Sequence, residues 1–185
     1  MTIYQQIVAA CWAVLLVVWF VLAIALGQRS GHHSRRAWLL RLGGVAVLVV
    51  AVYLLTRGRR LPVLVEPTRG AAIAGAALCV AGLVFALWAR VTMGRQWATP
   101  VEERAESDLV STGPFAYVRH PIYAGLIAMM IGGALNFPGA YAEVLTAVVS
   151  LVVLARKEER EMSQLLPGVY PAYMQRTKRF VPFVV

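Results

Sequence analysis

The sequence is poor in charge, and above all in negative charge. Only 15% of its 185 residues are Asp, Glu, Lys or Arg, and nine of them are acids, whereas a typical soluble domain carries about 25% charged residues. Hydrophobic residues make up 59% of the chain and the mean hydropathy is +0.67. This composition argues against a soluble globular domain and predicts one all-α membrane domain over residues 1–185.

The sequence has few cysteines and no cluster of metal-ligating residues, and both facts narrow the possible function classes. Cys11 and Cys79 are the two cysteines, and both lie in apolar runs, which indicates packing rather than a disulfide framework. His32 and His33 lack partner ligands, so no metal site is predicted. The net charge of +9 is not carried by a soluble domain, which argues against a nucleic-acid partner and for contact with the lipid bilayer.

Five apolar runs predict five transmembrane helices. The first is 20 residues long without a charge, enough to cross a hydrocarbon core of about 30 Å. The fourth and fifth runs are short and are joined by a turn at 136–140 that contains Pro138 and Gly139, so they read as a tight helical hairpin. The runs are Ile7–Leu26, Leu42–Thr56 (extended by Ala37–Leu40), Ala71–Ala89, Pro121–Leu135 and Tyr141–Ala155.

The distribution of Lys and Arg predicts the orientation. The side with 28–41, 90–120 and 156–185 carries 14 of them, and the other side carries 4. Basic loops stay in the cytoplasm, so we expect an integral membrane protein with an outer N-terminus and a cytoplasmic C-terminal helical segment. Residues 1–89 would hold three spans and 90–185 a long loop, the hairpin and the C-terminal helices. The small number of spans favours a prokaryotic inner membrane.

Two charged clusters at the predicted membrane surface indicate a site. The stretch 113–125 reads GPFAYVRHPIYAG, and 156–161 reads RKEERE. Ionisable residues at a membrane surface cost free energy, so a function is the default interpretation. One hairpin separates the clusters, and we therefore expect them to meet on one side of the bilayer. Beyond them, Tyr170 and Tyr173 share a face of a short helix opened by Pro171, and 176–180 reads as an interfacial anchor.

These stretches resemble the isoprenylcysteine carboxyl methyltransferase family, within a wider group of membrane methyltransferases. The resemblance covers about 88–182 and rests on Gly-Pro-Phe, Arg-His-Pro-x-Tyr-x-Gly, Glu-Glu-x-x-Met and Tyr-x-x-Tyr in this order, with a Gly-x-x-Trp element upstream. Where the family usually has Phe-Gly before the tyrosine pair, this chain has Leu166 and Pro167. The matching segments are Gly94–Trp97, Gly113–Phe115, Arg119–Gly125, Glu158–Met162 and Tyr170–Tyr173.

The resemblance implies S-adenosylmethionine as cofactor and a lipid-like methyl acceptor. Arg119 and His120 suit the cofactor's carboxylate, and Glu158 or Glu159 suits its ammonium or ribose. Aromatic faces suit the sulfonium or adenine, and a glycine in the fourth span would let the cofactor approach the backbone. The predicted cofactor-binding residues are Tyr117, Arg119, His120, Tyr123, Gly125, Glu158 and Tyr170.

Arg156 and Glu159 are predicted at the acceptor end, as the catalytic residues. A carboxylate or thiolate acceptor, such as one linked to an isoprenoid, needs no base, whereas an amine or thiol does, and Glu159 is then the candidate base. Two alternatives stay open: a phospholipid amine N-methyltransferase, and a non-enzymatic membrane module whose charges only set topology. Apolar acceptor walls do not identify the acceptor, and the oligomeric state is equally open.

Overall fold

The structure, a computed structural model, describes residues 1–27, 67–94, 109–137 and 139–181. Within these ranges every named element is a helix: α1 (Ile3–Gly27), α3 (Arg69–Met93), the short 3-10 helix η2 (Gly113–Ala116), α5 (Pro121–Ala134), α6 (Tyr141–Leu165) and α7 (Val169–Arg176). The predicted second span and the Gly-x-x-Trp element, apart from Gly94, lie outside the described residues. The predicted all-α class is confirmed.

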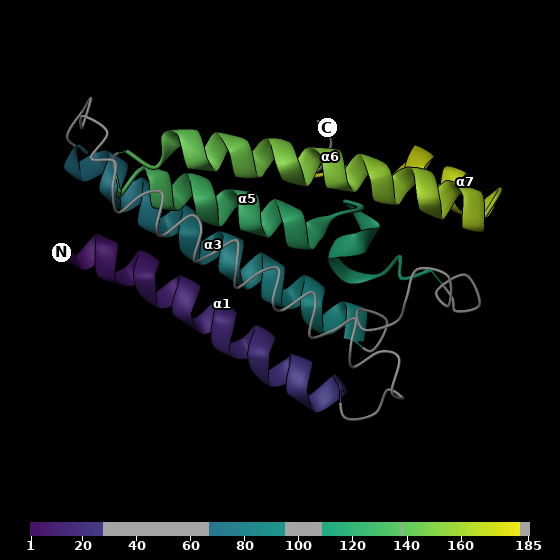
Figure 1. Cartoon of the computed structure of the whole chain (residues 1–185), viewed down its shortest axis with the longest axis horizontal. Helices are drawn as coiled ribbons and strands as arrows, with labels where there is room; N and C mark the ends of the chain where they lie inside the picture. Colours follow the sequence, from purple (N-terminus) through teal and green to yellow (C-terminus); the bar gives the residue numbers. More distant parts are fainter. Residues whose placement is uncertain (28–66, 95–108, 138, 182–185) are drawn as a thin grey trace.

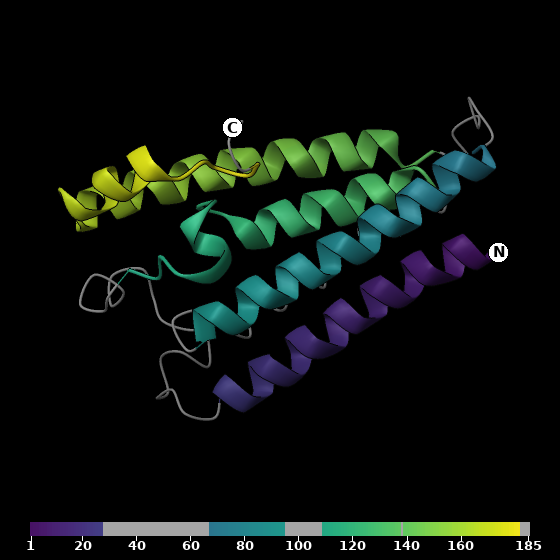
Figure 2. The same cartoon turned by 180° about the vertical axis from the view of Figure 1, so that it is seen from behind.

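The long helices lie side by side in the order α1, α3, α5, α6 (Figures 1 and 2). α5 runs antiparallel to both α3 and α6, so the α5–α6 hairpin predicted around the 136–140 turn is confirmed; Gly139 closes that turn at a φ of 110°. Two described helices are long and apolar enough to cross a membrane, within Ile3–Leu22 and Arg69–Met93, and α5 is a shorter apolar helix.

Helix α6 is longer than the predicted fifth span, Tyr141–Ala155. The apolar run and the charged stretch after it form one helix of 25 residues, Tyr141–Leu165. No glycine or proline interrupts this stretch, so nothing breaks its hydrogen-bond ladder. The helix ends before Pro167, and α7 begins at Val169 rather than at Pro171.

Glycines bring α3 and α5 into backbone contact. A Cβ on Gly82 would lie 2.6 Å from the Gly125 carbonyl oxygen, and a Cβ on Gly75 would lie 2.6 Å from that of Gly132. Small residues permit such close approach between membrane helices. The buried Asn136 side chain adds hydrogen bonds to the carbonyls of Ala72 (3.2 Å) and Gly132 (3.1 Å).

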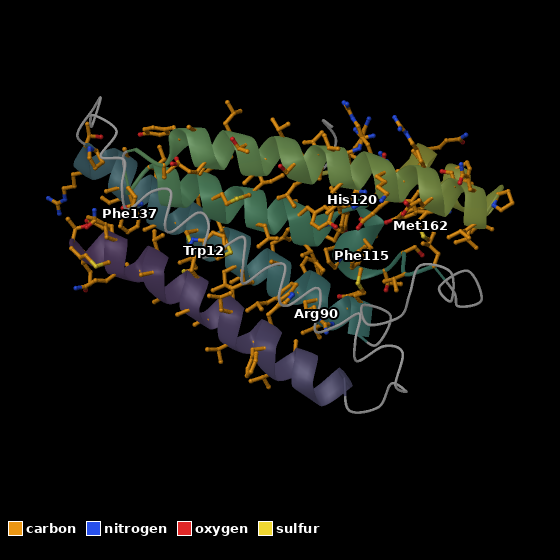
Figure 3. The ribbon with its side chains drawn as sticks, viewed as in Figure 1. Trp12, Arg90, Phe115, His120, Phe137 and Met162 are labelled. Carbon is orange, nitrogen blue, oxygen red and sulfur yellow. The ribbon has the colours of Figure 1, made fainter. Side chains whose placement is uncertain are left out.

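An apolar core joins α1, α3 and α5, and a second cluster of Ala89, Phe115 and Ile122 fixes η2 against the end of α3 and the start of α5. Figure 3 places Phe115, His120 and Met162 towards one end of the bundle and Phe137 at the other. The packed core therefore fixes the polypeptide immediately before α5, where the Arg-His-Pro sequence lies.

Candidate functional site

The two charged clusters meet, as predicted. Arg119 precedes α5 and donates from Nε to Glu159 Oε1 of α6 at 2.8 Å. Tyr123, in the first turn of α5, donates its hydroxyl to Glu158 Oε1 at 2.8 Å. Arg119 and Glu159 are 40 positions apart in the sequence, and Tyr123 and Glu158 are 35 positions apart. Both glutamates of the pair therefore contact the segment around the start of α5.

A third stretch, at the end of the described chain, completes the site. Lys178 and its neighbours run parallel to 118–120, where Arg119 N donates to Lys178 O at 2.7 Å and His120 N to Arg179 O at 3.1 Å. We call residues 177–181 the C-terminal strap. In Figure 2 the strap returns from α7 along α6 towards the segment before α5.

Glu159 is the centre of the ionic network. Its side chain is 5% exposed. Arg179 donates from Nη2 to Oε2 at 2.6 Å and from Nε to both carboxylate oxygens at 3.1 Å. Burial raises the pKa of this carboxyl, but the His120 imidazole and the Arg179 and Arg119 guanidinium groups lower it by more, so the pKa lies well below its ordinary range. Hydrogen bonding to Glu159 in turn raises the pKa of Arg179.

Arg179 and Phe180 were missed as site residues. Sequence reasoning placed them in an interfacial anchor because basic and aromatic residues are common there. Arg179 instead pairs with Glu159, and the Phe180 ring lies 5.9 Å from that of His120. The signal lies in backbone pairing between distant segments, which no spacing in the sequence reveals.

His120 lies between the two glutamates. Its Nδ1 is 3.6 Å from Glu158 Oε2 and its Nε2 is 3.5 Å from Glu159 Oε1. The ring stacks on Tyr123, with centroids 5.4 Å apart and planes at 1°. Among the described residues, the buried Nε2 has no hydrogen-bond partner of good geometry. This nitrogen faces the Glu159 carboxylate, and the imidazole helps to keep that carboxyl in its charged form.

Arg119 donates hydrogen bonds to three residues of the protein itself. Besides Glu159, it donates from one terminal nitrogen to the carbonyls of Met174 and Thr177. It thus ties α6, α7 and the strap together, whereas the sequence suggested a fork aimed at the cofactor's carboxylate. A positioning role for the network fits these contacts best.

The tyrosines and the glycine fall into three surroundings. Tyr170 and Tyr173 are buried, and burial raises the pKa of Tyr173 to about 12, so its hydroxyl stays protonated and donates to Phe115 O at 2.6 Å. Tyr117 is 55% exposed. Gly125 faces α3, so the close approach it permits in this structure is that of Gly82; an approach by the cofactor stays a prediction.

A pocket of about 470 Å³ opens beside Glu159 and contains Arg156. Its wall comes from one face of α6, with contributions from α7 and the strap. The lining residues are Arg156, Glu159, Arg160, Ser163, Gln164, Met174 and Arg179. Three guanidinium groups against one carboxylate make this pocket cationic and suited to an anion.

Comparison with known proteins gives a family for the site's own segment. Residues 75–165 match the model of the isoprenylcysteine carboxyl methyltransferase (ICMT) family. The chain is similar to protein-S-isoprenylcysteine O-methyltransferase B of Arabidopsis thaliana, with 28% identity over 115 residues, which are 60% of this chain and 58% of that protein. No solved structure matches it.

Two bacterial proteins are also similar. The nickel-cobalt-cadmium resistance protein NccN of Alcaligenes xylosoxydans xylosoxydans is 32% identical over 111 residues, 58% of this chain and 51% of its own length. The cobalt-zinc-cadmium resistance protein CzcN of Cupriavidus metallidurans is 33% identical over 95 residues, 49% of this chain and 44% of its own. The chain spans about half the length of the relatives it matches.

Proposed function

Because this chain belongs, through residues 75–165, to the isoprenylcysteine carboxyl methyltransferase family, we propose that the protein transfers a methyl group from S-adenosylmethionine to a lipophilic acceptor. The observation that carries the proposal is the convergence of Arg119, His120 and Tyr123 on the Glu158–Glu159 pair. A module whose charges only set membrane topology has no need for a network of buried, mutually oriented charges.

Glu158, rather than Glu159, is the better residue for the cofactor's ammonium or ribose. Its side chain is 37% exposed, and it accepts one hydrogen bond, from Tyr123, among the described residues. Glu159 is 5% exposed and already holds two guanidinium groups. A carboxylate takes up to about four donors, so Glu158 retains capacity that Glu159 has used.

The residues present fit S-adenosylmethionine at its polar end. The His120 imidazole can serve the carboxylate or a ribose hydroxyl, and the stacked His120–Tyr123 pair offers a face to the sulfonium or adenine. When bound, the cofactor supplies a methyl group made reactive by a positively charged sulfur. The protein's part is to hold donor and acceptor in line and to exclude water.

The acceptor that suits this site is an anion that needs no base. Glu159 was the candidate base for an amine or thiol, but its pKa is held well below the ordinary range, so it is a poor proton acceptor at neutral pH. The cationic pocket with Arg156 and Arg160 can orient a carboxylate instead. This combination favours an isoprenoid-linked carboxylate over a phospholipid amine.

We place the site at the cytoplasmic face of a prokaryotic inner membrane. The excess of Lys and Arg on the site's side supports this orientation. The exposed apolar residues of α1 and of the first part of α6, among them Phe20, Val21, Leu145 and Val149, would face lipid, through which a greasy acceptor could reach the pocket sideways.

Cofactor binding tests the proposal directly. S-adenosylhomocysteine, the product form of the cofactor, should raise the thermal midpoint of the purified protein, because a ligand that binds only the folded state stabilises it. Glu158→Gln and His120→Ala should weaken that binding by tenfold or more. Glu161→Gln is the matched control, since Glu161 is a neighbouring, half-exposed acid paired with Lys157.

If millimolar S-adenosylhomocysteine does not raise the thermal midpoint of the wild-type protein, the enzyme proposal is overturned. If wild type and all variants bind it equally, the assignment of the site is overturned. The acceptor is tested separately, by mass spectrometry of membrane lipids with and without the protein. We expect a product one CH2 unit heavier whose methyl group is removed by mild alkaline hydrolysis, as for an ester. A methylated amine would contradict the carboxylate assignment.

A further inference from the structure

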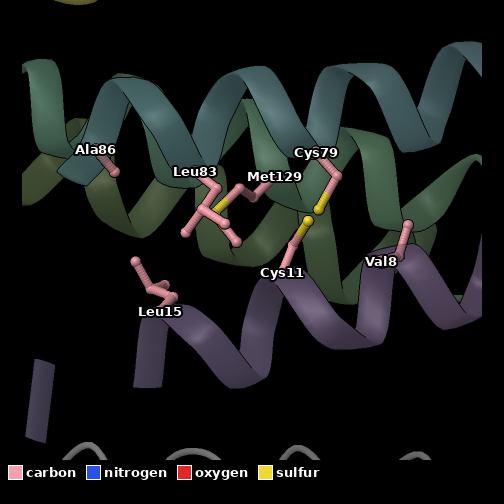
Figure 4. Close-up of a cluster of buried hydrophobic side chains, with 7 residues drawn as sticks. All are labelled: Val8, Cys11, Leu15, Cys79, Leu83, Ala86 and Met129. Atoms are coloured by element: carbon pink, nitrogen blue, oxygen red, sulfur yellow. The ribbon is translucent and has the colours of Figure 1, made fainter. Parts of the chain in front are cut away.

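Away from the methyl-transfer site, the two cysteine thiols face each other inside the bundle. Cys11 of α1 is 6% exposed and Cys79 of α3 is fully buried. Their sulfur atoms point at one another (Figure 4). Cysteines that serve only as small packing residues have no need to be paired across two helices.

A third sulfur atom comes from α5. Met129, fully buried, belongs to the same cluster as Cys11 and Cys79. The remaining buried members are Val8, Leu15, Leu83 and Ala86. The polarizable donor atoms of this cluster are therefore sulfurs, one from each of three helices. In Figure 4 the Met129 sulfur lies beside Leu83, and rotation of this unbranched, flexible side chain would bring it to the two thiols.

We propose that Cys11, Cys79 and Met129 form a binding site for a soft monovalent d10 cation, Cu(I) or Ag(I). Thiolate and thioether ligands select such ions, whereas Mg²⁺ and Ca²⁺ require oxygen ligands. Zn²⁺ in structural sites takes four ligands, one more than this cluster provides. The sequence alone gave no sign of the site, because the three residues come from distant apolar runs.

Charge balance supports a monovalent ion. When one cation binds, one thiol loses its proton to solvent, and the thiolate, the second thiol and the thioether remain as ligands. The site then has no net charge, which avoids the cost of burying an uncompensated ion among apolar side chains.

Thiol protection tests the proposal without any substitution. The chain has two cysteines, so the count of alkylated thiols reports this pair alone. In reduced full-length protein in detergent and chloride-free buffer, one equivalent of Ag(I) should slow alkylation of both thiols at least tenfold and release about one proton. Native mass spectrometry should show one silver ion per chain.

Variants then assign the ligands. Cys11→Ser combined with Cys79→Ser should abolish binding, and Met129→Leu should weaken it at least tenfold. Met130→Leu, next to it but outside the cluster, should bind as wild type. Unchanged alkylation rates in wild-type protein with Ag(I), or equal silver binding by the double serine variant, would overturn the proposal. None of these readouts depends on methyl transfer.

Discussion

At the residue scale, the adjacent residues Glu158 and Glu159 have different surroundings. Two adjacent glutamates point about 100° apart on a helix, so one of them turns inward and the other keeps contact with solvent. Glu159 turns inward and joins Arg119 to Arg179, and Glu158 stays half-exposed beside Tyr123 and His120. One glutamate holds the site together, and we propose that its neighbour contacts the ligand.

The lowered pKa of Glu159 predicts a pH dependence. The folded value lies below the unfolded one of about 4.3, so the contribution to stability is complete above that pH and is lost as pH falls towards the folded pKa. The thermal midpoint of wild-type protein in detergent should therefore drop steeply below about pH 4.3. Glu159→Gln should lack this part of the slope and be less stable at pH 7 by about 1–3 kcal/mol.

The control for this prediction is Glu161→Gln, which should keep the wild-type slope because its carboxylate is half-exposed and pairs with the exposed Lys157. A Glu159→Gln profile that runs parallel to wild type throughout the acid range would show that the ion pairs with Arg119 and Arg179 contribute nothing to stability.

At the element scale, the contact between α3 and α5 positions the start of α5 and with it the Arg-His-Pro sequence. The backbones approach at the Gly82–Gly125 and Gly75–Gly132 pairs, and each glycine lacks room for a Cβ. The charged part of α6 is also held in a fixed direction, because it continues the apolar part of the same helix without a break.

Gly82→Ala should destabilise the protein by about 1–3 kcal/mol, since an added methyl group would overlap the α5 backbone. Gly70→Ala, in the first turn of the same helix, is the control: its Cβ would have its nearest neighbour at 4.0 Å. That substitution should stabilise the helix by up to about 1 kcal/mol. Chemical unfolding in mixed micelles measures both, and similar effects would contradict the proposed backbone contact.

The sequence was a good guide to the helices and a partial guide to the site. Apolar runs predicted α1, α3, α5 and the first part of α6, because burial in lipid demands long uncharged stretches. Motif spacing brought Arg119, His120 and Tyr123 to the Glu-Glu pair. Motif spacing did not predict Arg179 as a site residue, because its position depends on backbone pairing between distant segments and such pairing leaves no periodic pattern in the sequence. The packing of Gly125 on α3 was also missed, because the register between two helices depends on the side chains of both helices.

At the scale of the whole molecule, the site forms only when three parts of the chain meet: the segment before α5, the charged end of α6, and the strap after α7. The strap is held by backbone hydrogen bonds as well as by Arg179, including Lys178 N to Tyr117 O at 3.1 Å. We therefore expect ligand binding to depend on residues near the end of the chain that do not touch the ligand.

Lys178→Pro tests this dependence, because proline lacks the N–H that pairs with Tyr117. Loss of one such bond costs about 1 kcal/mol, so S-adenosylhomocysteine should bind roughly fivefold more weakly, as measured by calorimetry. Lys178→Ala removes the exposed side chain but keeps the N–H, and it should bind as wild type. Weakening by both substitutions alike would point to the lysine side chain rather than to the strap.

The two glycine pairs also fix the register between α3 and α5. Gly75 and Gly82 are seven residues apart, and so are Gly125 and Gly132, so a slide of α5 along α3 by seven residues would still match one glycine with another. Such a slide moves the helix about 10 Å and would carry Phe115 away from Ala89, which it now contacts. Only the observed alignment seats both pairs, and the spacing of the four glycines thereby sets where along α3 the charged segment before α5 lies.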